Sequence, residues 1–258
     1  MPAINYLFAF MVATAAGMIN ALAGGGSLLT FPFLLAIGLP PVTANITNTL
    51  GLFPGSLAGT LAQANDLKGQ KNRLWIVIPA AILGGLTGAI LLLKTNDALF
   101  SNLVPFLILL AASLLAIQAP LQNWLARRQT QGISKVIPEA WIILPVFLGA
   151  IYGGYFGAGL GIILLAVLGL MLKNTLARLN VLKQIIAFST NLTAALLFIF
   201  SGKVVWSIAL VMAAGALLGG ATGGRVVNKF KPAVLRWIVV TIGFTVGMIY
   251  LVKTYFMA

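Results

Sequence analysis

The chain has 258 residues, of which 60% are hydrophobic and only 7% are charged, and it contains no cysteine and no histidine. Soluble domains carry about 25% charged residues, and a soluble fold of this size could not bury so much apolar surface. These numbers indicate an all-α polytopic membrane protein and exclude disordered, collagen-like and nucleic-acid-binding proteins. We also expect no disulfide, no Cys- or His-ligated metal and no cofactor.

The three carboxylates, Asp66, Asp97 and Glu139, all lie between apolar runs, so the sequence predicts a membrane interior without an acid. Intramembrane hydrolases and carboxylate-driven proton or sodium carriers need such an acid. An enzyme is therefore not expected. The net charge of +13 is best interpreted as a set of basic loop anchors at a lipid bilayer.

Apolar runs follow one another along the whole chain, and a spanning helix needs about 20 mainly apolar residues. The runs are 4–39, 43–63, 74–93, 99–118, 141–172, 179–200, 204–227 and 233–252. The runs 4–39 and 141–172 are too long for one span, and glycines interrupt them at 24–26 and 157–161. Because glycine weakens helices and permits tight turns, we predict a helical hairpin in each, with short second helices near 27–38 and 162–172.

The sequence repeats itself at a shift of 135 positions. The segment 83–88 (LGGLTG) aligns with 218–223 (LGGATG), and Asn45 aligns with Asn180 without a gap. We predict a first transmembrane repeat over 1–123, a cytoplasmic linker over 124–135 and a second repeat over 136–258. Duplicated halves are typical of secondary transporters.

The distribution of lysine and arginine distinguishes two topologies. If each long run crosses once, the halves are parallel and the basic residues divide eight against seven, with Lys183 set aside inside a span. If each long run enters and returns, the halves are inverted and the division is twelve against three. The second count satisfies the positive-inside rule.

We therefore predict two inverted repeats, each a glycine-broken helical hairpin plus three spanning helices. The linker would be cytoplasmic, both termini outside, and the chain integral to the cell inner membrane. Single cysteines at positions 68 and 203 would then react from opposite sides.

The two glycine breaks are the first candidate substrate-binding segments, because sites of inverted-repeat transporters lie near the midplane where broken helices end. The N–H groups at the start of a helix attract anions. The candidate residues are Gly24, Gly25, Gly26, Ser27, Gly157, Gly159 and Gly161. Alternatively, these glycines only allow close helix packing, the role that we expect for 84–85 and 219–220.

Polar residues on the helix after each hairpin are the second candidate set. Asn45 and Asn48 in the first half correspond to Asn180 and Lys183 in the second, and Asn191 follows on the same face. Such residues are costly against lipid, so we expect them to point inward. Interhelical hydrogen bonds, or snorkelling of Lys183 to the membrane edge, are the alternatives.

Tyr152 and Tyr155 adjoin the second glycine break. Their hydroxyls could donate hydrogen bonds to substrate oxygens. Packing in the helical core explains them equally well.

The chain resembles the sulfite exporter TauE/SafE family, also called the toluene sulfonate uptake permease family. The resemblance rests on 17–50, with its AGGGS break followed by FPFLLAIGLPP, on 179–202, and on 213–225 (AAGALLGGATGGR). It implies a bacterial-type inner-membrane permease for sulfur-containing anions such as sulfite, thiosulfate or organosulfonates.

Together these features predict a secondary transporter for a small anion, which an inside-negative membrane potential would drive outward. An anion channel and a membrane scaffold or assembly factor without transport are the alternatives. The partners expected are the small anion and the bilayer, with no nucleic acid, and a homo-oligomer is compatible with this interpretation.

Overall fold

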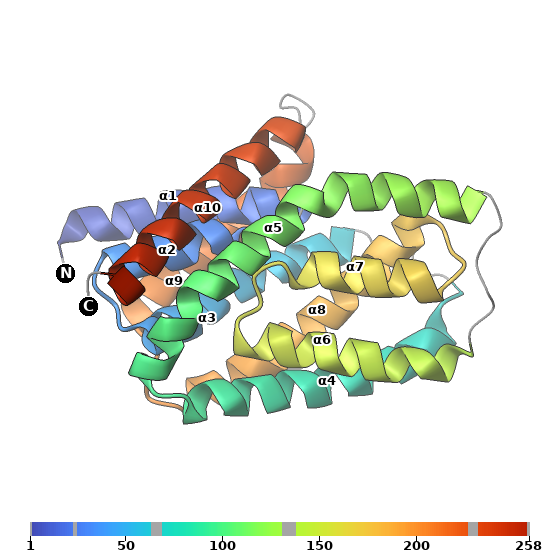
Figure 1. Cartoon of the computed structure of the whole chain (residues 1–258), viewed down its shortest axis with the longest axis horizontal. Helices are drawn as coiled ribbons and strands as arrows, with labels where there is room; N and C mark the ends of the chain where they lie inside the picture. The colour runs from blue at the N-terminus through green and yellow to red at the C-terminus, as the bar shows by residue number, and fades with distance from the viewer. Residues whose placement is uncertain (1, 23–24, 63–68, 131–137, 227–231, 257–258) are drawn as a thin grey trace.

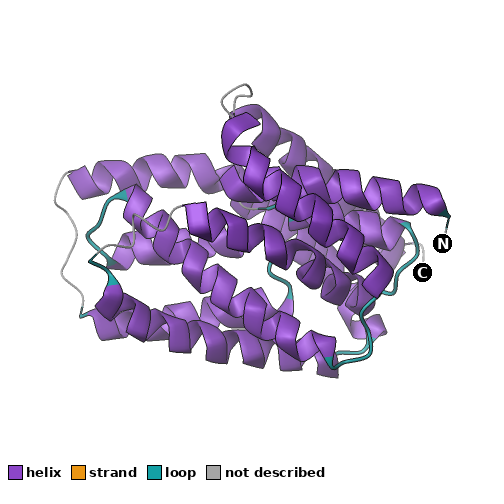
Figure 2. Ribbon diagram, turned by 180° about the vertical axis from the view of Figure 1, so that it is seen from behind, coloured by secondary structure: helices purple, strands orange, loops and turns teal. Residues whose placement is uncertain are grey.

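The computed structural model describes residues 2–22, 25–62, 69–130, 138–226 and 232–256. Every regular element in these ranges is a helix (Figure 2). The expected all-α class is therefore confirmed.

Among the described residues, five helices lie before the middle of the chain and five lie after it (Figure 1). The first five are α1 (Ala3–Leu22), α2 (Ser27–Ala36), α3 (Pro41–Ala62), α4 (Lys71–Lys94) and α5 (Asp97–Thr130). A 3₁₀ turn, η2 (Glu139–Ile142), leads into α6 (Ile143–Tyr155), α7 (Leu160–Met171), α8 (Leu176–Ile199), α9 (Trp206–Val226) and α10 (Pro232–Phe256). The starts of α3, α4 and α5 each lie 135 residues before those of α8, α9 and α10, which is the shift at which the sequence repeats.

Both long apolar runs form two helices, as the glycine breaks predict. The pairs are α1 with α2 and α6 with α7, and in each pair the second helix is short. The turns need glycine, because Gly25 has φ +108° and Gly157 and Gly159 have φ +79° and +80°. Residues that carry a side chain rarely adopt these backbone conformations.

Helix α5 is longer than its apolar run, 99–118, because it continues to Thr130. Residues 124–130 of the expected linker are therefore helical, and 131–135 lie outside the described residues. Leucine, glutamine, alanine and arginine, which favour helix, fill this extension. Pro105 and Pro120 lie inside the helix, where each removes one backbone hydrogen bond but does not end it.

The two halves pack in exchanged pairs of helices, in which a helix of one half lies along a helix of the other half. Helix α1 lies along α9, and α4 lies along α6, while α3 lies beside α8 and α5 crosses α10. Glycines also bring α4 close to α8 and α9 close to α3: a Cβ on Gly85 would lie 2.8 Å from the Thr190 carbonyl oxygen, and one on Gly220 would lie 2.9 Å from that of Gly55. The packing role expected for these two glycines is therefore confirmed.

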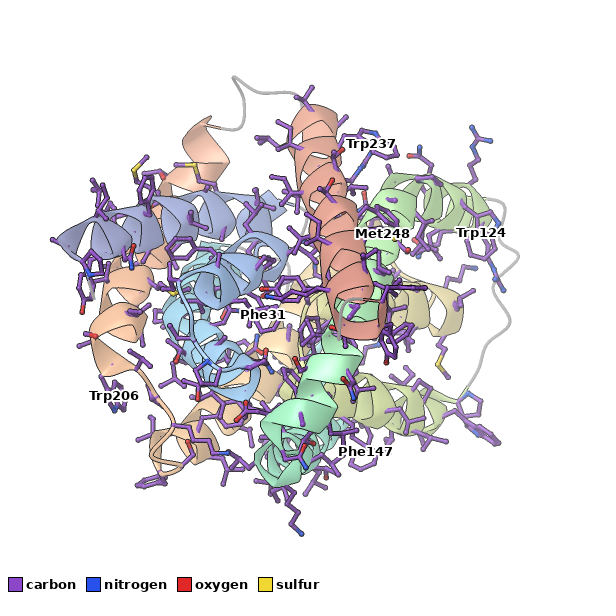
Figure 3. All side chains as sticks on the ribbon, turned by 60° about the vertical axis from the view of Figure 1, so that its left-hand side comes forward. Phe31, Trp124, Phe147, Trp206, Trp237 and Met248 are labelled. Carbon is purple, nitrogen blue, oxygen red and sulfur yellow. The ribbon has the colours of Figure 1, made fainter. Side chains whose placement is uncertain are left out.

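The outer surface has the character of a membrane protein. Five described helices, α1, α4, α5, α8 and α10, are long and apolar enough to cross a bilayer. Exposed tryptophans stand near helix ends, including Trp206 on α9 and Trp237 on α10, while Phe31 lies inside (Figure 3). Tryptophan favours the membrane–water interface, so the protein is integral to a membrane.

The ends of the molecule differ in charge. Helix α1 begins and α10 ends at one end, and α5 ends and α6 begins at the opposite end (Figure 1). The first end carries Lys94 at the end of α4, Lys203 in the loop before α9 and Lys253 in the last turn of α10. The opposite end carries Lys71, Arg73, Arg127, Arg128, Lys173 and Arg178.

Candidate functional site

A cavity of about 110 Å³ lies where the tips of the two hairpins meet α3 and α8. Pockets for drug-sized ligands measure roughly 300–1,000 Å³, so this cavity suits a small ion with some water. Both halves of the chain contribute walls. Asn20, Ser27, Asn48, Thr49 and Ser56 are polar lining residues of the first half. Lys183, Gln184 and Asn191 are those of the second.

The first hairpin tip is held by a hydrogen bond between its two arms. The Gly26 N–H donates to Asn20 Oδ1 at 2.8 Å. Helix α2 then starts at Ser27, and no side chain caps it. Gly25 and Ser27 line the cavity, so the start of α2 faces it.

The second hairpin tip is held in a different way. The Tyr152 hydroxyl donates to the Ala158 carbonyl oxygen at 2.5 Å. Gly159 precedes α7 in the left-handed conformation, and no side chain caps this helix either. Gly157, Gly159 and Gly161 all line the cavity. The N–H groups of Leu160, Ile162 and Ile163 already donate to the carbonyl oxygens of Gly157 and Gly159. This helix end therefore offers mainly the Gly161 N–H and a partial positive charge.

Equivalent positions of α3 and α8 form the remaining walls. At the shift of 135 residues, Asn48 corresponds to Lys183, Thr49 to Gln184, and Ser56 to Asn191, and all six side chains line the cavity. Phe53 and its equivalent Phe188 stack with ring centroids 5.4 Å apart. The cavity therefore lies between corresponding surfaces of the two halves.

Lys183 carries the positive charge of the cavity wall. Its Nζ donates to Asn180 Oδ1 at 2.7 Å, one turn back on α8. The same Nζ lies 3.8 Å from the point that a Cβ would occupy on Gly161, in the first turn of α7. No acidic residue is among the described residues that line the cavity. The ammonium thus faces the cavity and the start of α7 together.

Eight of the expected site residues line this cavity. They are Gly25, Ser27, Asn48, Gly157, Gly159, Gly161, Lys183 and Asn191. Gly24 lies outside the described residues.

The other expected residues lie behind the cavity wall. Asn45 Nδ2 donates to the Tyr155 carbonyl oxygen at 2.8 Å, which ties α3 to α6. The Tyr155 hydroxyl lies 3.4 Å from Thr95 Oγ1, outside the cavity lining. Tyr152 and Gly26 stabilise the hairpin tips, and Asn180 accepts from Lys183. The hydroxyls of both tyrosines thus contact other groups of the protein, and their role in substrate binding stays a prediction.

Thr49 and Gln184 also line the cavity, although the sequence did not single them out. Each follows a predicted residue, Asn48 or Lys183, and the two correspond at the shift of 135 residues. Since they are equivalent polar residues in both repeats, that correspondence could have identified them.

The cavity offers hydrogen-bond donors of the kind that suit an anion, and its described lining residues offer little for bond-breaking chemistry. Its donors are an ammonium, side-chain amides, hydroxyls and the starts of α2 and α7. Donors that converge without a facing carboxylate suit an oxyanion. The fold and this cavity together define an integral membrane protein with a polar site enclosed between its two halves.

Comparisons with known proteins identify the class. Residues 9–250 match the family described as sulfite exporter TauE/SafE. The chain is 31% identical over 243 residues to a probable membrane transporter protein of Haemophilus influenzae, covering 93% of each chain. It is 27% identical over 237 residues to the probable membrane transporter protein YfcA of Escherichia coli K12, covering 90% of this chain and 84% of that one.

A third relative, the probable membrane transporter protein ORF9 of Sinorhizobium sp., is 33% identical over 227 residues, or 84% of this chain and 81% of that one. No solved structure matches the chain. The protein is a membrane transporter. It belongs to the sulfite exporter TauE/SafE family.

Proposed function

We propose that this protein carries a small sulfur-containing anion, such as sulfite, thiosulfate or a small organosulfonate, through the cavity between its halves. The observation that carries the proposal is Lys183, whose ammonium faces the cavity beside the start of α7. None of the described lining residues is acidic. A buried cation needs a compensating charge, and a transported anion supplies one.

Donor chemistry and the family description both support this substrate class. An oxyanion accepts several hydrogen bonds at once, and Lys183, Asn191 and Gly161 in the first turn of α7 all line the cavity. The family description names a sulfite exporter. A cavity of about 110 Å³ favours the smaller members of this anion class.

Alternating access would proceed by rocking one inverted repeat against the other. Three features support this mechanism: the repeated order of helices, the exchanged packing of α1 with α9 and of α4 with α6, and a cavity between equivalent positions. The stacked pair Phe53 and Phe188 lies between α3 and α8, which would separate or slide as the halves move.

The basic end of the molecule would face the cytoplasm of a bacterial-type inner membrane, with both chain termini outside. In that orientation an inside-negative membrane potential favours outward movement of an anion that crosses without a coupled ion. The free energy gained is about 2.3 kcal/mol per charge per 100 mV. Export is therefore the direction that we propose for uncoupled movement.

Flux into proteoliposomes tests the function. Labelled sulfite, thiosulfate and methanesulfonate would be offered one at a time at a clamped membrane potential. We expect saturable flux of at least one anion, accelerated by the same anion on the opposite side. Flux without such acceleration would indicate a channel, and no flux of any anion in folded protein would contradict the proposed substrate class.

A further inference from the structure

Two buried amide oxygens of α3 have no hydrogen-bond partner among the described residues. They are Asn45 Oδ1 and Asn48 Oδ1, and their residues are only 1% and 2% exposed. Residues three apart on a helix are neighbours on its surface. An unsatisfied buried acceptor costs free energy comparable to a lost hydrogen bond, so this pair of oxygens indicates a missing ligand.

The orientation of the Asn45 amide follows from its surroundings. Its Nδ2 donates to the Tyr155 carbonyl oxygen at 2.8 Å. A carbonyl oxygen only accepts hydrogen bonds, so the amide cannot be reversed without losing this bond. The second amide atom of Asn45 is therefore an acceptor, and the missing ligand has to be a donor or a cation.

The second half shows what occupies the equivalent place. Asn45 corresponds to Asn180, and Asn180 Oδ1 accepts from the Lys183 ammonium at 2.7 Å. Lys183 in turn corresponds to Asn48. Where the second half has an amide oxygen paired with a fixed cation, the first half has two amide oxygens and no cation.

We propose that Asn45 and Asn48 bind a monovalent cation of the sodium class, which takes the place in the first half that the Lys183 ammonium takes in the second. Hard cations prefer oxygen ligands, and side-chain amide oxygens are among those that bind them in proteins. Amides do not take up a proton near neutral pH, so a proton is a poor candidate. Because no described lining residue of the cavity is acidic, a divalent ion would lack a compensating charge.

Asn48 lines the cavity, so cavity water and the substrate can complete the coordination shell. This step rests on the proposed function: the anion would lie between the bound cation on α3 and Lys183 on α8. A monovalent anion that crosses with one such cation carries no net charge. Its direction then follows the two concentration gradients and no longer the membrane potential alone.

Equilibrium binding of ²²Na⁺ to the purified protein, in choline chloride and without any sulfur anion, tests the site. We expect saturable binding that weakens at least tenfold in Asn45→Ala and in Asn48→Ala. Asn102→Ala is the matched control, because this asparagine is exposed at the start of α5, away from the cavity, and should leave binding unchanged. Absence of saturable binding in the unmodified protein, or unchanged binding in both site variants, would overturn the proposal.

Asn48→Lys supplies a second test, because it installs in the first half the ammonium that the second half already has. We expect this variant to lose ²²Na⁺ binding while still binding sulfite in choline buffer. Retention of full ²²Na⁺ binding would overturn the proposal. Size-exclusion profiles of all variants verify that they are folded, and the measurement on the unmodified protein stands without them.

The outcomes separate this site from the transport function. Saturable ²²Na⁺ binding without flux of any sulfur anion would support the cation site and contradict the proposed substrate. Saturable sulfite flux that is equal in sodium and in choline, without ²²Na⁺ binding, would support the transport function and overturn the cation site.

Discussion

Two corresponding helices, α3 and α8, form opposite walls of the cavity, but the side chains that they present to it differ. The first half presents Asn48, Thr49 and Ser56 at the positions where the second presents Lys183, Gln184 and Asn191. Corresponding helices carry both sets. The duplication thus accounts for the shape of the site, and one divergent position, Asn48 against Lys183, places its positive charge on one side. A symmetric pair of lysines would repel each other across a small cavity, whereas a single lysine leaves the opposite wall without a fixed charge.

The predicted inversion of one half against the other has the largest consequence that can be tested, because it decides on which side of the membrane each loop lies. Lys71 is the first residue of α4 and Lys203 lies just before α9, and these two helices correspond at the shift of 135 residues. We expect Lys203→Cys to react with a membrane-impermeant maleimide in intact cells, and Lys71→Cys only after permeabilisation. The chain has no cysteine of its own, so the unmodified protein serves as the unlabelled control.

Reaction of both cysteines from the same side would contradict the inverted arrangement. Corresponding loops would then lie on the same side of the membrane, and alternating access by two inverted halves would lose its basis.

Removal of the Lys183 side chain is expected to have the next largest effect, on the affinity for the transported anion. Lys183→Ala deletes the ammonium that faces the cavity. A hydrogen bond to a charged group contributes about 1.5–3 kcal/mol, so we expect the KM for the transported anion to rise roughly 10- to 100-fold. Initial rates over a range of anion concentrations in proteoliposomes measure this effect.

Lys203→Ala is the matched control, because that lysine is exposed between α8 and α9 and does not line the cavity. An unchanged KM in Lys183→Ala would show that this ammonium does not contact the substrate.

Close packing between exchanged helices predicts a smaller effect, on stability. A Cβ on Gly154 of α6 would press on the Gly85 carbonyl oxygen and lie 3.0 Å from the Ala89 nitrogen. On Gly149 of the same helix, the nearest atoms would be 3.5 Å and 3.8 Å away, at ordinary contact distance. We expect Gly154→Ala to destabilise the protein by about 1–3 kcal/mol and Gly149→Ala to be neutral or slightly stabilising.

Thermal unfolding in detergent, followed by size-exclusion chromatography, compares these two variants. Equal melting temperatures would contradict the close contact between α4 and α6.

Much of the fold could be predicted from the sequence, because glycine and apolar length act locally. The glycines at 24–26 and 157–161 predicted both hairpins, since few other residues tolerate the backbone of Gly25 or Gly159. The end of α5 could not be predicted from apolar length, because its last turns are polar and still helical. The assignment of the halves as 1–123 and 136–258 stays a prediction.

The site was harder to predict, because side-chain direction depends on packing between helices. Spacing placed Asn48, Lys183 and Asn191 on inward faces, and these residues do line the cavity. Spacing could not show that the Tyr152 hydroxyl turns to the Ala158 carbonyl, or that Tyr155 turns to Thr95. These contacts depend on the rotation of α6 against its neighbours.

The most direct test of the account is an experimental structure of the protein with bound selenite, whose selenium gives an anomalous signal and which has the shape of sulfite. We predict one selenium peak in the cavity between α3 and α8, with a selenite oxygen about 2.7–2.9 Å from Lys183 Nζ. A selenium peak away from this cavity, or an empty cavity in protein that transports selenite, would contradict the claim that the two halves enclose the anion site.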